Sequence, residues 1–144
     1  MADIHIEDFF KDAALILNQL YHLFPRKGAV FVEDISGPDS PDEYGLHCPR
    51  HEACFGTMLW LAEEGFLRYE STIRREAIDQ SVLSREAFLM LSSLCNPALL
   101  DCTESEPLHE LPYEQRTHIN LIRHLLKHGT STQLADIMHR LFAA

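Results

Sequence analysis

Apolar residues in the first part of the chain recur every three or four positions, which predicts one long amphipathic helix. This apolar stripe runs from Ile6 to Phe24, and Pro25 ends the helix because proline cannot continue it. A second helix is predicted from Pro49, which suits the first helical position, to Gly65 at its C-cap. The stripe of the first helix is wide, so we expect other elements to bury it.

Three short segments carry β-branched and aromatic residues between turn signals. They are residues 29–34, 66–71 and 77–83, and we expect them to form one small antiparallel sheet. A polar turn joins the last two segments. The pattern therefore predicts a β-hairpin with arginines at its tip.

Three further helices are predicted towards the C-terminus. Ser84 caps one over residues 85–94, and two more cover 113–128 and 130–142, with Thr130 and Gln133 forming a capping box. Stretches rich in Pro, Asp, Glu and Ser predict loops at 36–43 and 103–112. The resulting fold class is mainly α with a small antiparallel β-sheet. Residues 1–96 would form the main domain, and residues 97–144 a helical extension packed on it.

The order of these elements resembles the winged helix-turn-helix domain of transcription regulators. The stretch Leu59 to Leu91 carries the resemblance: Leu61, Gly65, Phe66 and Leu67 match the end of the family's recognition helix. Leu83 and Ser84 stand where the second wing strand runs into a helix. The similarity covers about residues 10–94. It implies a winged-helix core and a regulatory role through contact with DNA or with another protein.

Charge separates these two roles. The chain of 144 residues has 22 acidic and 12 basic residues, a formal net charge of -10, whereas affinity for phosphate backbones comes from Lys and Arg. The helix from Pro49 carries one arginine and none of the Lys, Asn or Gln that read base edges. The candidate DNA-binding residues are Arg50, Arg68, Arg74 and Arg75. A DNA-binding regulator and an acidic protein-interaction module that has lost DNA binding therefore both stay open.

No motif in the sequence points strongly to catalysis or to a cofactor. The weak candidates for metal ligands are His47, Cys48, His51 and Cys54. On one helix Cys48 and His51 share a face, but Cys54, six residues after Cys48, lies off that face. We therefore predict no metal, no cofactor and no enzymatic activity. A thiol or zinc hydrolase built on Cys48 and His51 is a distant third reading.

The expected compartment is the cytoplasm. The N-terminus has no signal pattern, no apolar run reaches membrane-spanning length, and four cysteines favour reduced thiols over a disulfide framework. No membrane partner is therefore predicted.

A homodimer is predicted, because the terminal helices have more apolar surface than a small winged core can cover. The candidate interface residues are Trp60, Leu134, Ile137, Met138 and Leu141. In the alternative, the C-terminal helical hairpin folds back on the first helix and completes a monomeric core.

Overall fold

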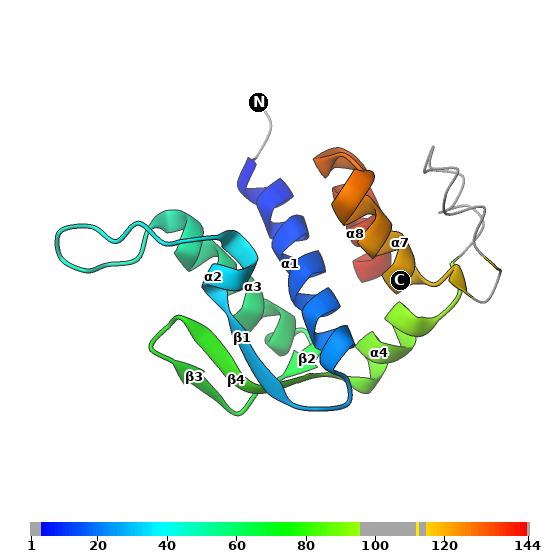
Figure 1. The fold of residues 1–144 in the computed structure, drawn as a ribbon, viewed down its shortest axis with the longest axis horizontal. Helices are drawn as coiled ribbons and strands as arrows, with labels where there is room; N and C mark the ends of the chain where they lie inside the picture. The colour runs from blue at the N-terminus through cyan, green and yellow to red at the C-terminus, as the bar shows by residue number, and fades with distance from the viewer. Residues whose placement is uncertain (1–3, 96–111, 113–114, 144) are drawn as a thin grey trace.

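Helix α1 (Ile4–Leu23) runs through the middle of the molecule, as Figure 1 shows. The computed structural model describes residues 4–95, 112 and 115–143. The inward residues of α1 repeat at helical spacing and are almost completely buried: Ala13, Ala14, Ile16, Leu17 and Leu20. The predicted first helix is thus confirmed.

A four-stranded antiparallel sheet lies beside α1. Its central strand is β4 (Ala77–Leu83), which pairs with β1 (Gly28–Phe31) on one edge. On the other edge β4 pairs with β2 (Leu67–Arg68) and β3 (Ser71–Ile73), which follow each other along the chain. One antiparallel sheet is therefore present as predicted, but the predicted strand 66–71 is interrupted at residues 69–70, and β3 lies mostly in the stretch predicted as a turn. We call the hairpin of β3 and β4 the wing.

The first strand is shorter than the predicted range 29–34. It ends at Phe31, and helix α2 (Val32–Ser36) begins at the next residue. Val32 and Ile35 are buried three positions apart, which is helical spacing. Glu33 and Asp34 lie in the first helical turn, where negative charge favours a helix.

The tip of the wing is a tight two-residue turn. The N–H of Glu76 donates to the carbonyl of Ile73 at 2.7 Å. The two residues between them, Arg74 and Arg75, have φ values of 48° and 58°. Two positive φ values match the twist of a hairpin but are unfavourable for residues other than glycine.

The remaining helices are α3 (Pro49–Glu63), α4 (Arg85–Ser92), α7 (His118–His128) and α8 (Ser131–Ala143). Cys48 is the N-cap residue of α3, and the predicted capping box is formed, with Gln133 N–H donating to Thr130 Oγ1 at 3.1 Å. Helix α7 begins five residues later than predicted, because Thr117 caps it by accepting from Asn120 N–H. The predicted loop at 103–112 lies outside the described residues apart from position 112.

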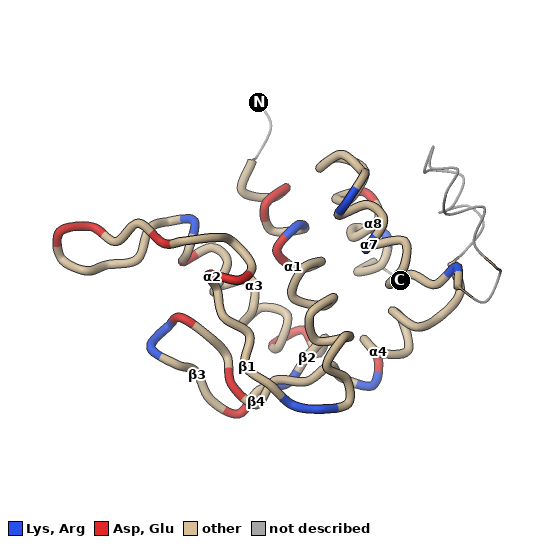
Figure 2. Tube along the Cα trace, in the orientation of Figure 1, with Lys and Arg blue, Asp and Glu red and all other residues tan. Residues whose placement is uncertain are grey.

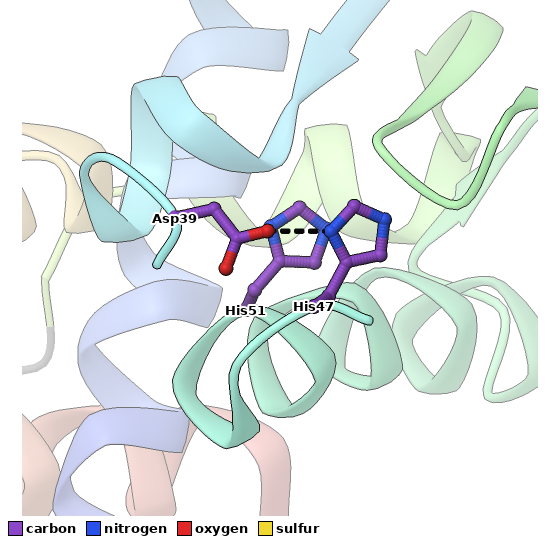
Figure 3. A group of neighbouring side chains, drawn as sticks. All are labelled: Asp39, His47 and His51. Carbon is purple, nitrogen blue, oxygen red and sulfur yellow. Dashed lines mark hydrogen bonds and ion pairs between the residues drawn. The ribbon is translucent and has the colours of Figure 1, made fainter. Parts of the chain in front are cut away.

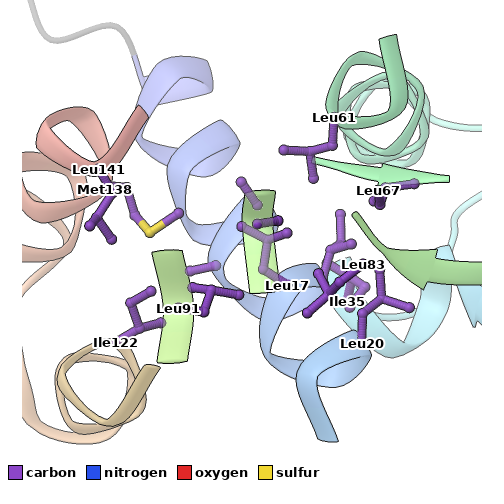
Figure 4. Close-up of a cluster of buried hydrophobic side chains, with 14 of the residues drawn as sticks. Leu17, Leu20, Ile35, Leu61, Leu67, Leu83, Leu91, Ile122, Met138 and Leu141 are labelled. Atoms are coloured by element: carbon purple, nitrogen blue, oxygen red, sulfur yellow. The ribbon is translucent and has the colours of Figure 1, made fainter. Parts of the chain in front are cut away.

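Helices α7 and α8 form a hairpin that packs on α1, on the side away from the wing (Figure 1). Figure 4 shows Met138, Leu141 and Ile122 of this hairpin converging on Leu91 of α4. No helix within the described ranges is both long and apolar enough to cross a bilayer.

This packing overturns four of the predicted interface residues. Leu134, Ile137, Met138 and Leu141 are all buried within the chain's own core, so they are not available to a second chain. The apolar surplus that predicted a dimer is covered by the hairpin folding back on α1. A homodimer stays a prediction, but these four residues no longer support it.

Replacing Met138 by glutamate should therefore destabilise the fold without changing how many chains associate. Met138 is completely buried, and an unpaired carboxylate there should lower the free energy of unfolding by at least about 3 kcal/mol. Urea denaturation measures this loss. A variant of native stability whose mass in sedimentation equilibrium falls from two chains to one would restore the interface role of α8.

Candidate functional site

An apolar groove lies between the first turns of α1 and the outer face of α3. It forms a pocket of about 270 Å³, lined among others by Ile6, Phe9, Gly56 and Trp60. Trp60 is 37% exposed and its ring meets the ring of Phe9 edge to face at 5.2 Å. Trp60, a candidate interface residue from the sequence, is therefore partly exposed. The same ring also packs 5.8 Å from Phe142 of α8, so it serves the core as well.

The exposed face of α3 carries small or apolar residues at the positions where a DNA-reading helix needs polar side chains. Ala53, Gly56 and Trp60 are exposed at spacings of three and four residues, which places them on one face. Gly56 has no atom within 4 Å of the position where a Cβ would stand. A glycine in a helix costs about 1 kcal/mol relative to alanine, and here it keeps the floor of the groove open.

Arg50, the one arginine of α3, points back into the protein. Its guanidinium makes two hydrogen bonds of 2.6 Å to the carboxylate of Asp12 on α1, and lies 3.6 Å from Asp8. Asp12 is only 1% exposed. The pKa of Arg50 is raised, mainly by its hydrogen bonds to Asp12. Arg50 therefore neutralises a buried acid of α1 and does not face a ligand. Asp12 cannot be recognised from the sequence, because its partner lies 38 residues away along the chain.

Arg75 of the wing is also paired within the chain. It donates to the Glu52 carboxylate of α3 at 2.5 Å, and its guanidinium lies 5.4 Å from the ring centre of Phe55. The hydrogen bond from Arg75 lowers the pKa of Glu52. Arg68 and Arg74 are exposed and form no ion pair with any residue in the described ranges. The structure thus does not bring the four candidate arginines together on one face.

Acidic residues surround the two arginines that remain free. Figure 2 shows acidic positions along the loop between α2 and α3, on the wing and at the end of α3. Glu76 and Asp79 lie in the wing with Arg74, and Glu70 lies two residues after Arg68 of β2. Phosphates within about 8–10 Å of these carboxylates would be repelled.

Two histidines and an aspartate meet where the loop 37–48 returns to the beginning of α3 (Figure 3). His47 Nδ1 lies 2.5 Å from Asp39 Oδ2, and His51 Nδ1 lies 3.7 Å from the same oxygen. The imidazole rings stack with their centres 3.9 Å apart. His47 lies just before the N-cap residue of α3 and His51 lies in the first turn of that helix, so the two rings are neighbours at the start of α3. The sequence singled out both histidines, but Asp39 could not be found from it because it reaches the cluster through a loop.

The backbone and thiol of Cys48 hold Asp39 in this cluster. Cys48 N–H donates to Asp39 Oδ1 at 3.0 Å. This bond, then the bond to His47 and the bond to the Cys48 thiol, lower the pKa of the Asp39 carboxyl group. The same Asp39 contact raises the pKa of His47. The loop 37–48 is therefore tied to the start of α3 by one carboxylate.

The predicted Cys-His set is only partly assembled. His47, Cys48 and His51 are close together, but the buried thiol of Cys54 contacts Ser36 and Asp12 instead. Burial raises the pKa of Cys54 to about 12 and that of Cys95 to about 11. These two thiols are thus poor nucleophiles and poor metal ligands at neutral pH.

The other histidine pair lies on α7. The rings of His124 and His128 are 5.2 Å apart, and burial, followed by the neighbouring His128, lowers the pKa of His124. No carboxylate or thiol within the described part of the chain completes a three-ligand set with them. This pair is a suitable control for the cluster at Asp39.

Comparisons with known proteins do not identify a family. No family model, no curated protein and no solved structure matches this chain.

Selective thiol labelling checks the placement of the cysteines. With iodoacetamide at pH 8, native protein should be modified at Cys48, while Cys54 and Cys95 stay unmodified, because burial keeps their thiols protonated. Mass spectrometry of the digested protein reports each site. All three should react in urea, and rapid labelling of Cys54 in the native state would contradict the buried position.

Removing Arg50 should destabilise the protein, because it leaves the buried Asp12 carboxylate without its partner. We expect Arg50→Met to lower the free energy of unfolding by about 2–3 kcal/mol, less than for a fully buried pair since Arg50 is partly exposed. The double variant Arg50→Met/Asp12→Asn should recover part of this loss. Urea denaturation measures both.

The matched control is Arg85→Met, which breaks an exposed pair with Glu86. Its effect should stay within about 0.5 kcal/mol. An Arg50→Met variant as stable as this control would mean that the ion pair to Asp12 contributes nothing.

Proposed function

We propose that this protein is a non-enzymatic regulatory module of the winged-helix type that acts by binding another protein. The order α1, β1, α2, α3, wing and α4 supports the resemblance seen in the sequence. The observation that carries the choice of partner is the pairing of Arg50 with Asp12 and of Arg75 with Glu52. Two of the four candidate arginines are therefore already neutralised by acidic residues of the same chain.

The groove between α1 and α3 is the surface proposed to bind the partner. Exposed apolar side chains at Ile6 and Trp60 flank it, and an aromatic side chain of this kind is a frequent anchor of protein interfaces. Glu52 of α3 is already paired with Arg75, whereas Glu63 and Glu64 at the end of the helix are exposed and form no ion pair among the described residues. An apolar groove beside carboxylates fits an amphipathic helix with leucine-type anchors and basic polar positions.

DNA and a second copy of this chain are the two alternative partners, and the charges described above disfavour both. DNA would have to bind through Arg68 and Arg74 alone among the candidate arginines, against the field of the acidic wing. A second copy of this chain would meet the groove with a net charge of -10 on each side, which opposes association. The predicted homodimer therefore remains open to test, with Trp60 as the one candidate interface residue that is exposed.

Two synthetic amphipathic peptides test the proposal. They share leucines at helical spacing and differ only in lysine or glutamate at the polar positions. The lysine peptide should bind and should shift the nuclear magnetic resonance signals of Gly56 and of the Trp60 indole, because it matches both the groove and its charge. The glutamate peptide should not bind. Equal binding of both, or shifts confined to other surfaces, would refute the proposal.

Gly56→Gln is the decisive variant, because it fills the groove without disturbing the core. Nothing lies within 4 Å of the new Cβ, and glutamine should stabilise the helix by about 0.5–1 kcal/mol. The variant should bind the lysine peptide at least about tenfold more weakly, or about 1.4 kcal/mol. Leu89→Gln changes an apolar side chain that is 56% exposed on α4, and should leave binding intact.

The same proteins distinguish the alternatives. Fluorescence anisotropy with a random-sequence DNA duplex at physiological salt should show no binding. Binding that weakens in Arg74→Ala would favour the DNA-binding regulator instead. A doubled mass in sedimentation equilibrium that Gly56→Gln halves would show that the groove binds a second copy.

A further inference from the structure

The hydrogen bond on the far side of the His51 ring fixes where its proton lies. His51 Nε2 is 2.9 Å from the carbonyl oxygen of Arg75. A carbonyl can only accept, so Nε2 carries a hydrogen and donates it. In the neutral ring Nδ1 then holds a lone pair. This is the ligand form of a histidine, and a backbone carbonyl on the other nitrogen is the usual way that proteins orient such a ligand.

The lone pair of His51 Nδ1 has no hydrogen-bond partner among the described residues. The atom is buried, and the whole side chain is 2% exposed. The nearest charged atom is Asp39 Oδ2 at 3.7 Å, which is too far for a hydrogen bond. Two electron-rich atoms thus face each other in the interior. This repulsion is relieved by a positive charge, either a proton on Nδ1 or a metal ion bound between the two atoms.

The three ligand atoms have the spacing of a small metal site. Asp39, His47 and His51 each offer one atom, and all lie within 4.8 Å of one another. A tetrahedral zinc ion with bonds of about 2.0–2.1 Å separates its ligand atoms by about 3.4 Å. The His51 distance is close to this value, while the 2.5 Å contact of His47 with Asp39 would have to widen. Two imidazoles and a carboxylate suit zinc and its neighbours better than calcium or magnesium.

We propose that Asp39, His47 and His51 bind one divalent transition-metal ion of the zinc class. This inference is independent of the proposed function. The fourth coordination position belongs to water or to the thiol of Cys48, whose backbone N–H donates to the Asp39 carboxylate. The ion would join three segments: the loop 37–48, the start of α3 and, through the Arg75 carbonyl, the tip of the wing.

The groups around the cluster are compatible with a cation. The Glu52 carboxylate acts electrostatically on both histidines, and the Arg75 guanidinium nearby is paired with that carboxylate. The carbonyl of Arg75, at the tip of the wing, faces the cluster and accepts from His51 Nε2. The positive end of the α3 dipole opposes a cation there, and the Asp39 charge offsets it.

Titration of the full-length protein, freed of metal by a chelator, tests the site. Isothermal calorimetry with zinc chloride should show one ion per chain. Cobalt chloride should give the visible absorption of tetrahedral cobalt, and a thiolate charge-transfer band if Cys48 is the fourth ligand. Asp39→Asn, His47→Gln and His51→Gln should each weaken zinc binding at least about tenfold. Zinc should also raise the melting temperature of wild type by mass action.

Two matched controls make the test decisive. His128→Gln removes one histidine of the α7 pair, and Cys54→Ser removes the buried thiol; both should bind zinc as wild type does. Asp39→Asn keeps an oxygen acceptor for Cys48 N–H, so its metal-free melting curve should stay close to wild type even if His51→Gln fails to fold. No zinc binding by wild type, or binding that only His128→Gln abolishes, would overturn the site. Peptide binding in the groove is measured separately, so failure of one proposal leaves the other standing.

Discussion

Burial of the apolar stripe of α1 is the constraint on which the rest of the structure depends. The stripe is too wide for one neighbour, so the sheet and α3 cover one side while the hairpin of α7 and α8 covers the other (Figures 1 and 4). Each buried leucine or isoleucine side chain contributes roughly 1.5–3 kcal/mol. This packing explains why the C-terminal residues 118–143 belong to the same core and leave no apolar face of α8 for a second chain.

The same packing decides what the basic residues can do. Asp12 is carried into the interior by α1, between apolar neighbours, and a carboxylate there needs a positive partner. Arg50 at the start of α3 is that partner, so the only arginine of this helix is paired with a buried acid of α1. Glu52 holds Arg75 on the surface in a similar way. Intramolecular neutralisation of arginines is thus a stronger argument against DNA binding than net charge alone.

The cluster at Asp39 connects segments that the core does not hold. The loop 37–48 leaves the body of the molecule after α2 and returns at α3 (Figure 1). Its exposed residues include Tyr44 and Leu46. One carboxylate, bonded to the backbone of Cys48 and facing two histidines, fastens its ends. A bound ion would tighten this connection and fix the loop relative to the wing. The proposed metal site would then have a structural role and not a catalytic one.

Local pattern alone determined most of the helices, the antiparallel sheet, the caps at Ser84 and Thr130 and the α+β class, because side-chain periodicity and capping act over a few residues. It misplaced the end of the first strand, because the acidic residues Glu33 and Asp34 favour a helix there. It also misplaced the start of α7, because Thr117 caps that helix. Tertiary structure alone decided the partners of Arg50, Arg75 and His51. Those partners lie 38, 23 and 24 residues away. Such contacts follow from how elements pack, and local spacing in the sequence does not encode them.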